Sequence, residues 1–101
     1  MWVHEPHMAI YVRRSQRILT SDQPALTPCL DIASVEVDDG HRGRGLFTDF
    51  LTRFERSAKK LKCAVYVESI QNIRLEKFLG ERGYKWTHNS SDVAPNMYKF
   101  P

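Results

Sequence analysis

The residues from Leu46 to Leu61 carry the pattern that most restricts what this chain can fold into. Apolar residues recur there at offsets of three and four, and charged residues fall between them, as in a helix with one buried face. The apolar set is Leu46, Phe47, Phe50, Leu51, Phe54, Ala58 and Leu61. The pattern predicts an amphipathic helix of about four turns.

Strand-like segments lie on both sides of this helix. Residues 29–37 (CLDIASVEV) are apolar and β-branched enough for a buried strand, and residues 63–68 (CAVYVE) alternate as a strand does. A strand, a helix and a second strand of these lengths predict one right-handed parallel crossover.

The flanking segments extend this unit at both ends. The expected elements are strands at 8–14 and 17–20 joined by a turn at residues 15 and 16, a helix at 71–82, and strands at 84–87 and 97–100. The element order is then β-β-β-α-β-α-β-β, with a mixed sheet that is α/β in the centre and α+β at its edges. A length of 101 residues predicts a single domain covering 1–101.

The turn before the helix, HRGRG at 41–45, is the candidate binding element. Its glycines let the backbone curl, and the N–H groups at a helix start attract anions. Arg42 and Arg44 add positive charge, so the turn suits a ligand that carries phosphates. It contains neither the GxxxxGK[ST] of a P-loop nor the GxGxxG of a dinucleotide fold. On this turn alone, a solvated loop with incidental arginines is an equal alternative.

Two motifs resemble those of a known family. Arg42, Gly45 and Phe47 stand where the GCN5-related N-acetyltransferases (GNATs) have their pyrophosphate-binding RxxGxG signature, with Phe47 in place of the final glycine. The second motif is an Asn that opens a helix ending in Gly and an aromatic, here Asn72 and Gly83–Tyr84. The resemblance covers about residues 8–100 and is sharpest from 35 to 84.

The resemblance implies that the chain binds acetyl-CoA in a cleft where the strands at 29–37 and 63–68 splay apart. The backbone of Val35 and Val37 would line the pantetheine arm, and an N–H near Val37 would polarise the thioester carbonyl. Asn72 would hold the cofactor arm from the opposite side. The pyrophosphate would be cradled by His41, Arg42, Gly43, Arg44, Gly45, Leu46 and Phe47.

The implied reaction passes the acetyl group directly to a primary amine, which needs a base. The candidate carboxylates are Glu36, Asp31 and Glu68, each of which has a solvated or salt-bridged side chain as its alternative role. Some protein-acetylating GNATs have a base at the position of Asp31, and strand parity would place Asp31 on the same face as Val37. Leu79 stands where the family often has a tyrosine acid, so Tyr84 is the candidate acid, with Tyr66 as another.

Partner and location follow from what the sequence lacks. Only seven residues precede Met8, so the helices that shape the acceptor pocket in the family are not expected. An open acceptor side suits a lysine or N-terminus of a protein, or a site completed by a second subunit in a homodimer, better than a small amine. A catalytically silent module that binds CoA or a protein is the alternative.

Net charge and composition further restrict the classes of partner that we expect. A net charge of +3 argues against a nucleic-acid partner, although a basic run at 53–62 keeps that alternative open. No apolar run is long enough for a membrane span, and reduced Cys29 and Cys63 fit a cytoplasmic protein. His4 and His7 lack further ligands nearby, so no metal site is expected.

Overall fold

The computed structural model describes residues 1–22, 25–38, 40, 45–68, 70, 73–88 and 95–101. Within these residues the element order is the predicted one. The elements are β1 (Trp2–Glu5), β2 (Met8–Arg17), β3 (Thr27–Val37), α1 (Leu46–Leu61), β4 (Ala64–Val67), α2 (Ile73–Glu81), β5 (Lys85–Trp86) and β6 (Met97–Lys99).

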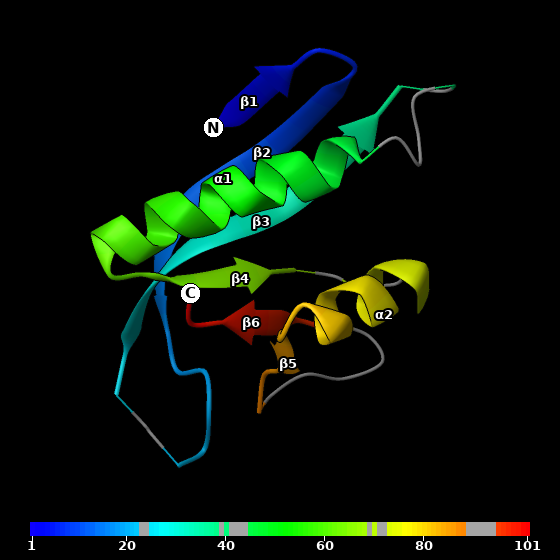
Figure 1. The fold of residues 1–101 in the computed structure, drawn as a ribbon. Coiled ribbons are helices and arrows are strands. Elements are labelled where there is room, and N and C mark those ends of the chain that lie inside the picture. The colour runs from blue at the N-terminus through cyan, green and yellow to red at the C-terminus, as the bar shows by residue number, and fades with distance from the viewer. Residues whose placement is uncertain (23–24, 39, 41–44, 69, 71–72, 89–94) are drawn as a thin grey trace.

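The strands form one mixed sheet with the order β1-β2-β3-β4-β6-β5. The β3–β4 pair is parallel and the other pairs are antiparallel, so the predicted central crossover is confirmed. In Figure 1, α1 crosses in front of β2 and β3, and α2 lies beside β4 and β6. One apolar core takes buried residues from both helices, including Leu51 and Leu79, so both helices cover the same face of the sheet.

The first hairpin differs from the prediction. No turn interrupts the chain at residues 15 and 16, because β2 runs unbroken from Met8 to Arg17 and pairs with β3 along that length. The hairpin joins β1 to β2 instead, with Glu5 opposite Met8. His7 takes a positive φ of 65° in this turn, a conformation that a tight hairpin requires and that few residues other than glycine adopt.

A bulge in β3 changes which residues face the helices. Tyr11 pairs with Ser34 and Val12 pairs with Ile32, so Ala33 is an extra residue in β3. Before the bulge Leu30 and Ile32 pack into the core under the helices, and after it the inward-facing residues are Val35 and Val37.

This bulge corrects one expectation about the site. Asp31 lies opposite Arg13 on the face that the helices leave uncovered, whereas Val37 packs against the core under the helices. The two residues therefore do not share a face, because the parity rule on which that expectation rested holds only for a strand without an inserted residue.

Helix α1 matches its predicted bounds. It begins after Gly45, which has a positive φ of 76°, and it buries Phe50, Leu51 and Ala58. At its end Lys62 takes a left-handed conformation, and its N–H donates to the carbonyls of the last turn. The apolar face of α1 packs on the core, and this contact fixes where the helix lies after β3.

Candidate functional site

The parallel strands β3 and β4 diverge part of the way along. They pair from Cys29 opposite Ala64 to Ile32 opposite Val67, and the N–H of Glu68 donates to the Ile32 carbonyl at 3.0 Å. Beyond this point β3 continues to Val37 while β4 has ended. The bulge at Ala33 lies at the point of divergence and bends β3 away from its neighbour.

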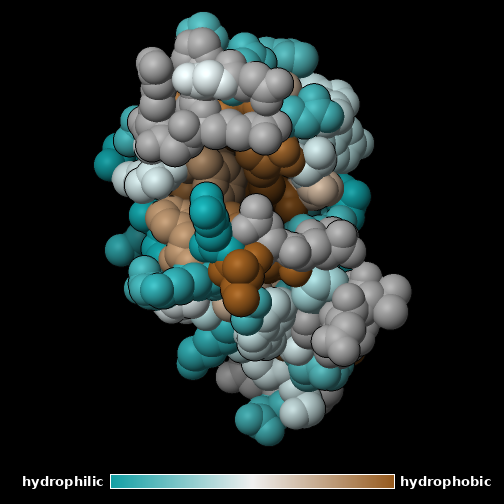
Figure 2. Space-filling view, turned by 90° about the vertical axis from the view of Figure 1, so that its right-hand side faces the viewer, coloured by the Kyte–Doolittle hydropathy of each residue, from teal (hydrophilic) through white to brown (hydrophobic). Residues whose placement is uncertain are grey.

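The divergence leaves two adjoining cavities, which we call the crevice. The first has a volume of about 260 Å³ and is lined by Ile32, Ala33, Ser34, Val35, Phe47, Val67, Glu68 and Leu75. The second, also about 260 Å³, is lined by Val37, Gly45, Leu46, Phe47, Thr48, Arg74, Leu75 and Phe78. Phe47 and Leu75 belong to both. Figure 2, which views the side where α1 begins, shows a hollow with a hydrophobic floor.

The start of α1 forms one end of the crevice. Gly45 caps the helix without any side-chain hydrogen bond, and nothing lies within 4 Å of the position where a Cβ would stand. The N–H groups of a first helical turn have no partner inside the helix and carry partial positive charge. This end of the crevice therefore favours an anion.

Several predicted cofactor-binding residues line the crevice and others cannot be placed. Val35, Val37, Gly45, Leu46 and Phe47 all line it. His41, Arg42, Gly43, Arg44 and Asn72 lie outside the described residues.

Among the three candidate carboxylates, Glu68 is the one that lines the crevice. Its side chain is 20% exposed, and its Oε1 accepts hydrogen bonds from the Nη2 atoms of Arg17, at 2.7 Å, and of Arg13. Two guanidinium groups thus fix its position at the point where β3 and β4 part. Glu36 is exposed on β3 and lines neither cavity.

Asp31 is fully buried and already accepts hydrogen bonds from three side chains. Its carboxylate accepts hydrogen bonds from Arg13 Nε at 3.1 Å, Ser15 Oγ at 2.8 Å and Arg17 Nη2 at 2.9 Å. Arg17 therefore bridges Asp31 and Glu68 through one nitrogen. This geometry suits Asp31 to holding the arginines rather than to exchanging protons with a substrate.

Tyr66 completes this polar cluster from β4. The guanidinium carbon of Arg17 lies 4.0 Å from the centre of the Tyr66 ring, a stacked cation–π contact. Burial raises the pKa of Tyr66 above its ordinary value, although the neighbouring Arg17 acts in the opposite direction. Tyr66 therefore keeps its hydroxyl proton at neutral pH and serves mainly as a platform for the arginine.

Tyr84 lies away from the crevice. It is 3% exposed, it lines neither cavity, and its hydroxyl donates to Glu55 Oε2 at 2.6 Å. Burial and this hydrogen bond raise the pKa of Tyr84 well above its ordinary value. Leu79, at the family's tyrosine position, is fully buried in the core. Among the described residues, no tyrosine lines the crevice.

The sequence reasoning missed the wall that α2 contributes. Leu75 and Phe78 line the crevice from one face of α2, and the ring centres of Phe78 and Phe47 are 6.3 Å apart. Their spacing of three residues, which places them on one side of the helix, was the available signal. Arg82 fixes this helix to α1 through hydrogen bonds to Glu55 at 2.9 to 3.2 Å.

Metal ligands and cysteine thiols are the other potentially reactive groups in the described part of the chain. No cluster of three His, Cys, Asp or Glu residues suited to a metal ion is found there. Cys29 and Cys63 are both free and buried, and burial raises the pKa of Cys29 to about 11, so its thiol is protonated at neutral pH. None of the helices described has the length and apolarity that crossing a membrane requires.

Comparisons with known proteins bear on the fold. No protein-family model and no curated protein matches the sequence. The crystal structure of a KacTA–DNA complex is similar, with a TM-score of 0.66, 12% identity, and coverage of 91% of this chain and 57% of that chain. An acetyltransferase from Bacillus cereus ATCC 14579 has a TM-score of 0.51, 15% identity, and coverage of 86% and 71%. The chain thus spans little more than half the length of the first of these structures, and it has a GNAT-like fold.

Proposed function

We propose that this protein is an N-acetyltransferase that moves an acetyl group from acetyl-CoA directly to a primary amine. The observation that carries the proposal is the crevice, an apolar slot between diverging strands that ends at the uncapped start of α1. A GNAT-like fold and an acetyltransferase among similar structures support the same reaction.

The residues present fit this co-substrate. The apolar side chains of Val35, Phe47 and Leu75 would contact the uncharged pantetheine arm. The N–H groups at the start of α1, with Arg42 and Arg44 from the preceding turn, would bind the phosphates. Asn72 would contact the arm from the α2 side. Acetyl-CoA supplies an activated acyl group as a thioester.

The main chain of β3 would stabilise the charge that develops on the thioester oxygen. After Ile32 this segment has no β4 partner, so the main-chain groups on its edge away from β2 face the crevice. A donor aimed at such an oxygen in a dry site contributes roughly 2.7 to 4 kcal/mol. We place this donor in the β3 segment that ends at Val37.

Glu68 would accept the proton that the attacking amine loses, directly or through one water. The new bond joins the amine nitrogen to the acetyl carbon, the carbon–sulfur bond breaks, and the sulfur leaves as CoA thiolate. With Leu79 buried, solvent rather than a tyrosine there returns a proton to the thiolate. Arg13 and Arg17 hold Glu68 in place throughout.

The acceptor would approach from the face of the sheet that the helices leave uncovered, because the cluster of Glu68 and its arginines lies there. An open face admits an amine on a protein as well as a small amine. A homodimer that completes this side is also consistent with the proposal.

Isothermal titration calorimetry with acetyl-CoA tests the proposal. We expect saturable binding, and we expect Arg42→Ala combined with Gly45→Glu to weaken it at least tenfold by removing charge and obstructing the turn. Arg56→Ala, on the exposed side of α1, is the control and should bind as the parent does. Absence of binding at about 1 mM cofactor, or unchanged affinity in a folded double variant, would reject the site.

A second candidate function is a catalytically silent module that binds CoA or a protein through the same crevice. The buried Leu79 favours it, because the family's usual acid has no counterpart in the crevice among the described residues. Release of free thiol with a panel of amines and proteins separates the two functions. Acceptor-dependent release that Glu68→Gln reduces supports the enzyme, whereas binding without any release supports the silent module.

The same panel should include duplex DNA. One of the similar structures is a DNA complex, so the comparisons leave the expectation against a nucleic-acid partner unconfirmed. Binding that weakens steeply with added salt would support such a partner.

A further inference from the structure

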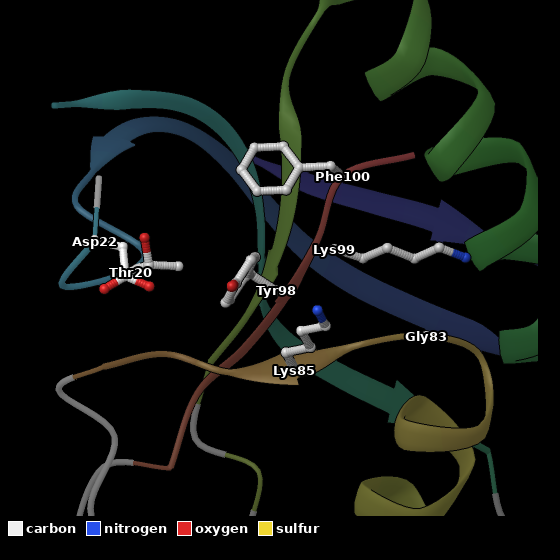
Figure 3. A pocket seen from close by; sticks show the side chains of 7 residues that line it. All are labelled: Thr20, Asp22, Gly83, Lys85, Tyr98, Lys99 and Phe100. Carbon is white, nitrogen blue, oxygen red and sulfur yellow. The ribbon is translucent and has the colours of Figure 1, made fainter. Parts of the chain in front are cut away.

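A separate cavity of about 450 Å³ lies on the other side of the sheet from α1, near β5 and β6. Its lining residues are Thr20, Asp22, Gly83, Lys85, Tyr98, Lys99 and Phe100. It shares no residue with the crevice. Figure 3 shows the side chains of this second cavity, with Thr20 and Asp22 on one side of the Tyr98 ring and Lys85 on the other.

The wall that carries Thr20 and Asp22 is anchored to the sheet. Leu19 is 2% exposed and packs with Tyr66 and Tyr98 in an apolar cluster on the uncovered face. The N–H of His88 donates to the Leu19 carbonyl at 3.2 Å. These contacts hold Leu19, at the base of this wall, against the sheet.

The floor is aromatic and is fixed by the sheet. Lys85 and Tyr98 are direct partners in the β5–β6 ladder, which places their side chains next to each other on one face. The rings of Tyr98 and Phe100 meet edge to face with centres 5.7 Å apart. Phe100 is nevertheless 55% exposed, so an apolar group could still cover its ring.

The charged side chains around this floor differ in whether they have an ion-pair partner. The ammonium of Lys99 turns to the helix side, 3.7 Å from Glu55 Oε2 and 5.7 Å from the centre of the Tyr84 ring. In Figure 3 its side chain runs away from Tyr98 and Phe100. Lys85 and Asp22 have no ion-pair or hydrogen-bond partner in the part of the chain that the structure describes.

Within the described residues, the cavity therefore presents an exposed cation and an exposed anion without partners, together with an exposed ring. A simple anion such as phosphate would meet repulsion from Asp22, and a simple cation would meet repulsion from Lys85. A zwitterion satisfies both charges at once, and an apolar group on it would cover Phe100.

We propose that this cavity binds a free α-amino acid with an apolar or aromatic side chain. Its carboxylate pairs with Lys85, its ammonium pairs with Asp22, and its side chain packs on Phe100. The proposal is independent of acetyl transfer, because none of these residues lines the crevice.

Calorimetric titration of the full chain with L-phenylalanine, L-leucine and L-serine tests the proposal. We expect saturable binding of the first two, binding of serine at least tenfold weaker, and a loss of at least tenfold in Lys85→Met. Lys77→Met, an exposed lysine on α2 outside the cavity, should bind as the parent does. No binding of any of the three at about 10 mM would overturn the proposal.

The ammonium contact has its own control. N-acetyl-L-phenylalanine keeps the carboxylate and the ring but has no ammonium, so it should bind the parent at least tenfold more weakly than phenylalanine does. Asp22→Asn should weaken phenylalanine and leave the N-acetyl compound unchanged. Equal losses for both ligands, or no loss for either, would contradict the assignment. Lys85→Met and Asp22→Asn should bind acetyl-CoA as the parent does, because neither residue lines the crevice. This expectation holds whether or not the protein transfers an acetyl group.

Discussion

The two halves of β3 differ in what surrounds them. From Cys29 to Ile32 the strand is paired on both sides, and Asp31 and Ile32 are buried. After Ala33 it is paired with β2 alone, and its other edge faces a crevice closed by α2. One strand thus lies within the sheet in its first half and lines the crevice in its second, and the division falls at a single inserted residue.

The largest expected effect lies in the first half. Asp31→Ala should lower the free energy of unfolding by about 3 kcal/mol, because it leaves Arg13 and Arg17 without their buried partner; their partial exposure keeps the loss at the lower end of the usual range. Urea unfolding measures it. Glu36→Ala, exposed in the second half, should change stability by less than about 0.5 kcal/mol. Equal losses would mean that the halves do not differ in this way.

The same enlargement should act differently at two valines. Val65→Phe, at a fully buried position opposite Leu30, should cost about 2 kcal/mol through overpacking. Val35→Phe places its ring in the crevice and should cost less than about 1 kcal/mol, while weakening acetyl-CoA binding at least fivefold if the proposed function is right. Unfolding curves and calorimetry give both quantities. A Val35→Phe chain that is as unstable as Val65→Phe would show that the crevice is closed.

Helix α2 lies across the crevice from the second half of β3, and its attachment to α1 depends on Glu55. Its carboxylate binds Arg82, accepts from Tyr84 and is 12% exposed, so Glu55→Gln should cost about 1 kcal/mol at pH 7 after allowance for the partial exposure of Arg82. Urea unfolding measures the loss. Arg56→Ala, exposed on the same helix, is the control and should change stability by less than about 0.5 kcal/mol.

The effect of Glu55 should also depend on pH. Burial alone would raise the pKa of Glu55, but its hydrogen bonds from Arg82 and Tyr84 outweigh burial and lower it. A lowered pKa in the folded state means that this stabilisation is full above the ordinary value of about 4.3 and is lost as pH falls through the folded value. The difference between parent and variant should therefore shrink below about pH 4. A difference that persists unchanged at pH 3 would contradict this account.

The last comparison is between Gly45, in the turn that follows the second half, and Gly80 in α2, where the smallest effect is expected. Gly45→Ala should cost about 1 kcal/mol, entirely from its positive φ, because nothing stands near the new methyl group. Gly80→Ala in α2 also meets open space but without a positive φ, so it should stabilise by about 0.5 kcal/mol. Thermal unfolding shows whether each variant is less or more stable than the parent. A gain in stability in both variants would mean that Gly45 is not held in the left-handed conformation.

The sequence predicted most of the architecture because its strongest patterns are local. The apolar spacing of α1 and the β-branched runs of β3 and β4 predict the crossover without any knowledge of tertiary contacts. The first hairpin was misplaced because the prediction put its turn at Ser15 and Gln16, whereas the turn lies at Pro6 and His7, between the strands that pair as β1 and β2. Residues 15 and 16 stay extended because β3 pairs with them across the sheet, which no local pattern records.

The candidate site was predictable in part. Its strand backbone, Gly45 and Glu68 were identified from motifs and residue types, and all of them line the crevice. The role of Asp31 as the centre of an arginine cluster depends on β2 lying alongside, which is a tertiary contact. The face of Asp31 relative to Val37 depends on the bulge, and alanine at 33 gives no sign of one in sequence.

The extra residue in β3 also makes the strand sensitive to length. Removing one residue at the bulge would bring the two halves into a single regular alternation, in which Ile32 and the valines of the second half still point to the helices. A single-codon deletion at Ala33 would therefore keep both faces of the strand but remove the bend that parts it from β4.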